Sequence, residues 1–65
     1  MIALNKKTAD RLLSDLNDGA DEGRARKAVR SYRQAPNDTN RTSAITALAA
    51  LGEERQRELR QVARA

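Results

Sequence analysis

The 65-residue chain contains no cysteine and no histidine. It therefore lacks the disulfides and the usual zinc ligands that stabilise many small folds. The same absences remove the histidine base and the cysteine nucleophile on which many enzymes depend, and the chain has no glycine-rich phosphate loop. Ser14, Ser31 and Ser43 have no activating partner nearby in the sequence. We expect a protein that is not an enzyme and that uses no metal, cofactor or small-molecule substrate.

Aromatic residues, proline and glycine are also scarce: the chain has one tyrosine (Tyr32), one proline (Pro36) and three glycines. A single aromatic side chain provides no platform on which successive bases of a single-stranded nucleic acid would stack. Apolar residues recur with helical spacing, and the alternation that indicates a strand does not persist beyond a few residues near the N-terminus. The sequence therefore predicts an all-α fold.

Long apolar runs are absent as well. No segment approaches the ~20 apolar residues that span a bilayer. The opening residues MIALNKK have neither the charge order nor the apolar centre of a signal peptide. Together with the absence of cysteine, these features favour a cytoplasmic protein that does not contact a membrane.

Helix signals divide the single expected domain, residues 1–65, into a small bundle of three helices. The first helix is expected over about residues 5–18. Asn5 is a good N-cap, and Gly19 would end the helix in the left-handed conformation. The apolar stripe of this helix consists of Ala9, Leu12, Leu13 and Leu16.

The second helix is expected over about residues 21–35. Asp21 is the expected cap at its start. Pro36 would stop it, because the proline ring forces the preceding residue out of helical geometry. One side of this helix is apolar and consists mostly of alanine: Ala25, Ala28, Val29, Tyr32 and Ala35.

The third helix is expected over about residues 40–64, either continuous or broken or bent at Gly52. Its segment Ala44–Leu51 reads AITALAAL, which is apolar on nearly every side apart from Thr46. A helix without a polar face belongs in the interior or at an interface. We therefore expect this segment to be the central helix of the bundle.

Two features predict association with another chain. A protein of this size buries only about 60% of the surface that its unfolded chain exposes. Residues 53–65 offer only Leu59, Val62 and Ala63 for packing, which suits a helix that packs against a partner chain. We expect a homodimer, whose self-association residues come from the apolar segment: Ala44, Ile45, Ala47, Leu48 and Leu51.

Positive charge is concentrated in the middle of the chain. The formal net charge is +4, and residues 23–41 contain six cations against one acid, Asp38. In the flanking segments and at the start of the second helix, the spacing of charges predicts ion pairs within the helices. These expected pairs are Lys7–Asp10, Arg11–Asp15, Glu22–Arg26 and Glu53–Arg57.

Five cations of the second helix are the candidate binding residues: Arg24, Arg26, Lys27, Arg30 and Arg33. At about 100° per residue, Arg24 and Arg33 flank the apolar stripe. There, Asp10 or Asp15 of an antiparallel neighbouring helix would meet them. The other three are expected to point away from the bundle.

Three interpretations of this surplus charge remain open. The guanidinium group of arginine binds phosphates and carboxylates through two parallel hydrogen bonds. The basic helix therefore favours a nucleic-acid-associated regulator that contacts the phosphate backbone of a duplex. Alternatively, the protein is an adaptor or inhibitor that docks on an acidic protein surface through its second and third helices, and the arginines steer the association. In the third interpretation, the cations form a solvated face that promotes only solubility.

Overall fold

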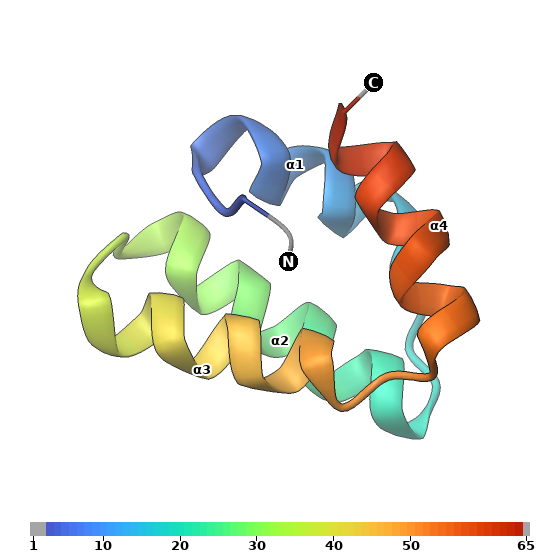
Figure 1. The fold of residues 1–65 in the computed structure, drawn as a ribbon. Helices are drawn as coiled ribbons and strands as arrows, with labels where there is room; N and C mark the ends of the chain where they lie inside the picture. Colours follow the sequence, from blue (N-terminus) through green and yellow to red (C-terminus); the bar gives the residue numbers. More distant parts are fainter. Residues whose placement is uncertain (1–2, 65) are drawn as a thin grey trace.

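A computed structural model describes residues 3–64, so Met1, Ile2 and Ala65 lie outside the described residues. Its regular secondary structure consists of α-helices joined by short turns (Figure 1). These are α1 (Lys6–Asp15), α2 (Ala20–Gln34), α3 (Asp38–Ala49) and α4 (Glu53–Arg64). The all-α prediction is confirmed, and the prediction of three helices is wrong. Within residues 3–64, no helix has both the length and the apolar character needed to cross a membrane.

The third expected helix is two helices because the chain breaks around Gly52. Helix α3 ends at Ala49, and the Gln56 side chain donates hydrogen bonds to the carbonyls of Ala49 (3.1 Å) and Leu51 (2.6 Å). The Gln56 N–H in turn donates to the Gly52 carbonyl at 2.9 Å, which makes Gly52 the N-cap of α4. Gln56 thus bonds to carbonyls at the end of α3 through its side chain, and its N–H makes the first hydrogen bond of α4.

The start of α1 follows the prediction from the sequence. The Asn5 side chain accepts a hydrogen bond from the Thr8 N–H at 3.0 Å, and the Thr8 hydroxyl accepts one from the Asn5 N–H at 2.9 Å. This reciprocal arrangement is a capping box. The Thr8 hydroxyl also donates to the Ala3 carbonyl at 2.9 Å, which holds the segment before α1 against the helix.

The predicted turn between the first two helices is wrong in two respects. Helix α1 ends at Asp15, and Leu16 adopts an extended conformation with its side chain buried. Gly19 has a φ angle of −64° and is the N-cap of α2, so it is not left-handed, and Asp21 lies in the first turn of α2. The Asn17 side chain accepts a hydrogen bond from the Gly19 N–H at 2.8 Å. This bond closes the turn without a positive φ angle.

The other end of α2 is as predicted. The helix ends at Gln34, and Ala35, which precedes Pro36, is no longer helical. Asn37 caps α3 by accepting a hydrogen bond from the Asn40 N–H at 2.8 Å. The Asn40 side chain donates to the Ala35 carbonyl at 2.8 Å, which ties α3 to the end of α2. The two helices run side by side in opposite directions (Figure 1).

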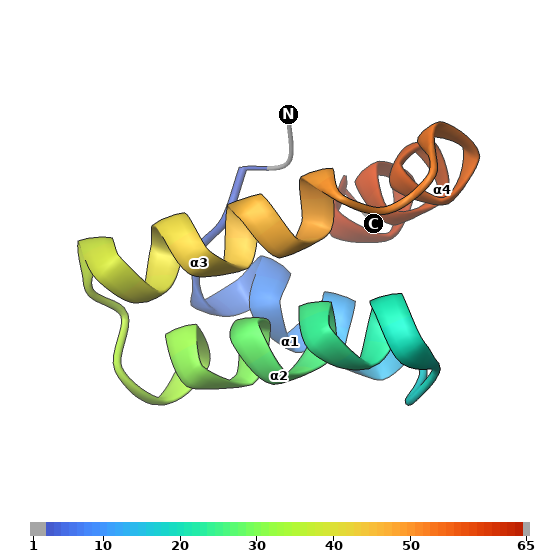
Figure 2. The same cartoon turned by 90° about the horizontal axis from the view of Figure 1, so that it is seen from below.

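Helix α1 packs against both α2 and α4, whereas α3 packs mainly along α2 (Figure 2). The prediction that the apolar segment is the central helix is therefore wrong. Helix α3 turns Ala44 and Leu48 inward, and its opposite side is exposed. Helix α4 packs on α1 within the same chain, with Leu59 fully buried.

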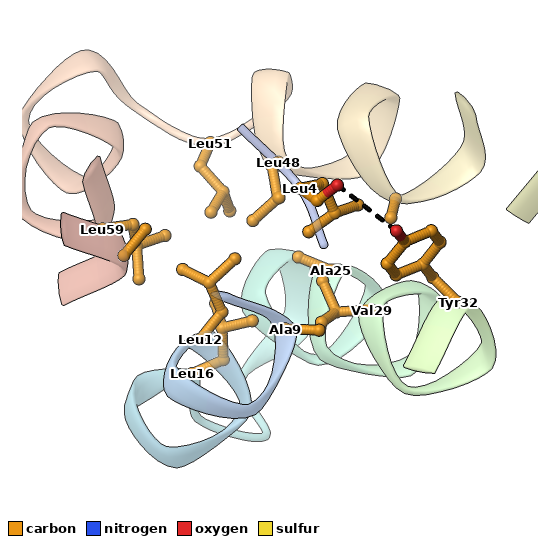
Figure 3. Packing of buried hydrophobic residues seen from close by; sticks show 12 residues of the cluster. Leu4, Ala9, Leu12, Leu16, Ala25, Val29, Tyr32, Leu48, Leu51 and Leu59 are labelled. Carbon is orange, nitrogen blue, oxygen red and sulfur yellow. Dashed lines mark hydrogen bonds between the residues drawn. The ribbon is translucent and has the colours of Figure 1, made fainter. Parts of the chain in front are cut away.

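The core lies where the four helices meet (Figure 3). Tyr32 of α2 reaches the N-terminal segment, and its hydroxyl donates a hydrogen bond to the Leu4 carbonyl at 3.3 Å. This bond ties the segment before α1 to α2 at Leu4, whose side chain is buried in the core. The buried apolar residues are Leu4, Ala9, Leu12, Leu16, Ala25, Val29, Tyr32, Ala44, Leu48, Leu51, Leu59 and Ala63.

Candidate nucleic-acid interface

Two of the five candidate cations on α2 are held by acidic residues of the same chain. The Arg33 Nε atom lies 2.7 Å from Asp10 Oδ1 of α1, and this is one of the pairings that the sequence predicts for this flank. The Arg26 Nη1 atom lies 3.1 Å from Asp18 Oδ1, in the loop between α1 and α2. The prediction that Arg26 points away from the bundle is therefore wrong.

The path of the α1–α2 loop explains the contact of Arg26. Arg26 stands only about 60° around the helix from the buried Val29, and the loop passes close to α2 at Gly23. A Cβ atom at Gly23 would lie 3.1 Å from the carbonyl oxygen of Asp18. The absence of a side chain at Gly23 thus lets Asp18 approach α2 within reach of Arg26.

The other three candidate cations, Arg24, Lys27 and Arg30, form what we call the basic face of α2. All three residues are exposed, and none makes an ion pair with a residue in the range 3–64. Because they are spaced by three residues, they form a ridge that turns through about 120° over about 9 Å of helix. Residues 24–33 contain no acid that would interrupt the ridge.

An arginine of α4 engages the acids near the start of α2. Arg55 lies 2.9 Å from a carboxylate oxygen of Glu22, 2.9 Å from one of Asp15 and 3.0 Å from one of Glu58. It also donates a hydrogen bond to the Asp15 carbonyl at 3.0 Å. We call these four residues the Arg55 cluster. It joins the end of α1, the start of α2 and the start of α4.

Helical spacing accounts for one of the ion pairs within residues 3–64, Arg55–Glu58 on α4, which is not among the expected pairs. Within residues 3–64, none of the four expected local pairs is formed. Arg11, for example, does not contact Asp15 through an ion pair, and it donates instead to the Ala63 carbonyl at 2.8 Å. Of the five ion pairs within residues 3–64, four join two helices or a helix and a loop. The packing of α1 against α2 and α4 brings these charged side chains together.

Sequence reasoning misses Arg55 because two of its three acidic partners are distant in the chain. Glu22 is 33 residues away and Asp15 is 40 residues away. One signal was available: Arg55 precedes the buried Leu59 by four residues, which places it on the buried side of α4. A cation on the inner side of a helix requires acidic partners from the helices against which it packs.

The Arg55 cluster also fixes the charge state of Glu22. The hydrogen bonds from Arg55 hold the pKa of Glu22 below its ordinary value, although partial burial opposes this shift. The same contact raises the pKa of Arg55, which therefore stays charged. An ionised Glu22 that is already engaged by Arg55 does not neutralise the basic face of α2.

A groove of about 430 Å³ lies between α2 and α3, beside the basic face. Asp21 and Arg24 line it from α2, and the α3 side is uncharged: Thr42, Ser43, Thr46, Ala47 and Ala50. No group of three carboxylate side chains in residues 3–64 is placed to hold a metal ion.

The expected self-association residues fall into two groups. Ala44, Leu48 and Leu51 belong to the core and are at most 7% exposed. Ile45 and Ala47 pack against the core but are only partly buried. Of this set, Ile45 and Ala47 are the two that retain side-chain surface for contact with a second chain, and the dimer itself stays a prediction.

Comparisons of the chain with protein-family models, with curated proteins and with solved structures find no match. Function is therefore inferred from the charges and contacts of the chain itself.

Proposed function

We propose that the protein is a non-enzymatic, nucleic-acid-associated regulator, and that the basic face of α2 contacts the phosphates of a duplex. One observation supports this proposal above all. Arg24, Lys27 and Arg30 are exposed along one ridge and have no ion-pair partner among the residues described. We place this activity in the cytoplasm, in keeping with a chain that lacks cysteine.

The basic face suits a phosphate backbone in its length and in its chemistry. Its three cations are spread along about 9 Å of helix, and one strand of a duplex presents about three phosphates over that length. Arginine binds phosphate oxygens through a planar fork of donors. Arg26 extends the face, because its partner Asp18 is highly exposed, and a surface ion pair of this kind contributes less than ~1 kcal/mol.

Phosphate contacts make binding depend on the salt concentration in a predictable way. Each neutralised phosphate contributes about −0.9 to the slope of log K against log salt concentration. Three contacts therefore give a slope of about −3 for one copy and about −5 for a homodimer with two basic faces. Fluorescence anisotropy of a short labelled duplex, measured between about 50 and 200 mM salt, gives this slope directly.

Two double variants separate the basic face from the effect of net charge. Lys27→Gln/Arg30→Gln and Lys6→Gln/Lys7→Gln each remove two exposed cations that have no ion pair with a described residue. The α2 variant is expected to reduce the magnitude of the slope by about 2 per copy, whereas the α1 variant leaves it nearly unchanged. Equal losses in both variants, or no duplex binding at low salt, would contradict the proposal.

The groove between α2 and α3 favours a second candidate function, a protein-binding adaptor or inhibitor. The groove places Arg24 beside an uncharged wall, and an acidic polypeptide would contact both, whereas a phosphate backbone would contact only the arginine. In that case Lys27→Glu/Arg30→Glu slows association with the partner more than it speeds dissociation. Ultraviolet absorbance before and after a high-salt wash distinguishes the candidates. Nucleic acid that salt removes supports the first, and a stoichiometric acidic polypeptide supports the second.

A further inference from the structure

Helix α4 carries three more arginines on one side, Arg57, Arg60 and Arg64, which we call the α4 arginine stripe. Their spacing of three and four residues places them within about 60° of one another around the helix. Arg57 and Arg64 are exposed, and Arg60 is half-buried. In the part of the chain that the structure describes, none of the three makes an ion pair.

The acids of α4 leave this stripe largely uncompensated. Glu53 and Glu54 lie in the first turn of the helix, and Glu58 is engaged by Arg55 at 3.0 Å. Residues 59–64 contain no acid. The last two turns of α4 therefore present only positive charge, as the middle of α2 does.

The α4 arginine stripe and the basic face of α2 lie on different sides of the molecule. Helix α4 turns Leu59 and Ala63 toward α1, and α2 turns Ala25 and Val29 toward the core. Figure 2 shows α2 along the lower edge of the molecule and α4 at the upper right, above the start of α2. Because each helix turns its buried side inward, the two positively charged surfaces face outward and away from each other.

We propose that the α4 arginine stripe is a second phosphate-binding surface, so that one copy of the protein holds two duplex segments, one on α2 and one on α4. This inference rests on the proposed function of the basic face of α2. The stripe runs over eight residues, from Arg57 to Arg64, or about 10 Å of helix, and it therefore matches about three phosphates of one strand, as the α2 face does.

One straight duplex does not reach both surfaces. The longest extent of the molecule is 27 Å, which corresponds to about eight base pairs. A duplex resists bending over a length of about 150 base pairs, so it does not wrap from one side of so small a body to the other. Two surfaces that face apart therefore link two separate segments.

A capture assay with the full chain tests this linkage. Two short duplexes of unrelated sequence are used, one immobilised and one fluorescent, and the wild-type protein is expected to retain the fluorescent duplex on the immobilised one. Arg57→Gln/Arg60→Gln/Arg64→Gln is expected to reduce this capture at least about tenfold. The same variant still binds a single duplex through the basic face of α2, with a salt slope that stays near about −3 per copy.

Three controls accompany the assay. Arg24→Gln/Lys27→Gln/Arg30→Gln is expected to lose capture to a similar degree, because linkage needs both surfaces. Arg57→Lys/Arg60→Lys/Arg64→Lys keeps the charge and is expected to keep capture, and Lys6→Gln/Lys7→Gln is expected to behave as the wild type. Glutamine and lysine have helix propensities close to that of arginine, and circular dichroism verifies that each variant is folded.

The outcomes separate this inference from the function on which it rests. Capture at the wild-type level by the α4 glutamine variant overturns the inference but leaves the α2 proposal intact, because linkage would then not need the α4 arginine stripe. A wild-type protein that binds one duplex but never captures a second overturns it as well. Capture at the wild-type level by the α2 glutamine variant overturns both, because linkage would then not need the basic face of α2.

Discussion

Arg55 of α4 and Glu22 of α2 are joined by two hydrogen bonds, from Nη2 to Oε1 at 2.9 Å and from Nε to Oε2 at 3.1 Å. Both side chains are mostly buried, with 24% and 20% of their surface exposed. Two parallel bonds fix the orientation of one planar group against the other. The pair therefore fastens the start of α4 to the start of α2, two elements that otherwise contact each other little.

Replacement of Arg55 by glutamine is expected to lower the free energy of unfolding by about 1–3 kcal/mol, because charge-assisted hydrogen bonds to several partners are lost. Arg57→Gln removes an exposed cation from the same helix and is expected to change stability by less than about 0.5 kcal/mol. Urea unfolding followed by circular dichroism measures both. Equal stability of the two variants would show that the Arg55 cluster contributes no more than a surface charge.

Lowering the pH is expected to weaken the pair between Glu22 and Arg55. Since the pKa of Glu22 in the folded protein is below its ordinary value of 4.5, the unfolded chain takes up the proton first as the pH falls. The stability that ionised Glu22 contributes is fully present above about pH 4.5 and is lost as the pH falls through the lowered pKa. Urea unfolding of Glu22→Gln over this acid range should therefore depend less on pH than that of the wild type.

The exposed Glu54 provides the control for this pH dependence. Glu54→Gln removes a carboxylate that has no ion pair within the described range 3–64, and it should keep the wild-type pH profile. If Glu22→Gln and the wild type lose stability in parallel on acidification, another carboxylate is responsible for the effect.

Tyr32 and Arg41 hold the N-terminal segment, and removal of the tyrosine hydroxyl should loosen it. Arg41 donates from Nη1 to the Leu4 carbonyl at 2.8 Å and from Nη2 to the Tyr32 hydroxyl at 3.1 Å. Tyr32→Phe keeps the ring and the Leu4 contact of Arg41, so the expected loss is about 1 kcal/mol, or about 4–8 °C in Tm. Ser31→Ala, on the exposed side of α2, should leave Tm unchanged or slightly raised. A Tm for Tyr32→Phe equal to that of Ser31→Ala would contradict this role.

Sequence patterns succeeded where one local interaction determines the structure. Asn5 caps α1 through a contact three residues away, and Pro36 stops α2 through its own ring. The sequence around Gly52 permits both a bend in the helix and its end. The Gln56 side chain bonds to carbonyls five and seven residues back, at the end of α3. The periodicity of apolar residues gives no sign of such a bond.

The candidate site was only partly predictable for a related reason. Arg33 meets Asp10 as expected, because antiparallel packing of α1 on α2 follows from a short connection. Arg26 meets Asp18 because the loop path depends on the close approach at Gly23. The helix wheel gives the direction of a side chain only coarsely, as Arg26 shows, and the ion-pair partner depends on where loops and neighbouring helices place their acids.

Gly52 offers a stabilising substitution. It is the N-cap of α4, and a Cβ atom built there meets nothing within 4 Å. Gly52→Ser is expected to raise the free energy of unfolding by about 0.5–1 kcal/mol, because serine is a better N-cap and restricts the unfolded chain. Gly52→Ala, which lacks the capping oxygen, should be less stable than Gly52→Ser in thermal unfolding. The reverse order would show that the serine oxygen does not cap α4, and a loss of stability in both variants would show that this turn does not tolerate a side chain.

The predicted homodimer is expected to depend on Ile45 rather than on Leu48. Leu48 is 4% exposed and belongs to the core, whereas Ile45 is half-buried and keeps apolar surface on the outside of α3. Light scattering should give twice the chain mass of 7.2 kDa for the wild type and the single-chain mass for Ile45→Gln, at unchanged helix content.

Ser43 lies on the groove side of α3, and Ser43→Gln should leave the dimer intact. A wild-type protein that is monomeric at every concentration, or a dimer that Ile45→Gln does not disturb, would contradict a dimer interface on α3. A monomer would also change the expected duplex binding, because each molecule would then present one basic face of α2. The part of the salt slope due to that face would be about −3 instead of about −5.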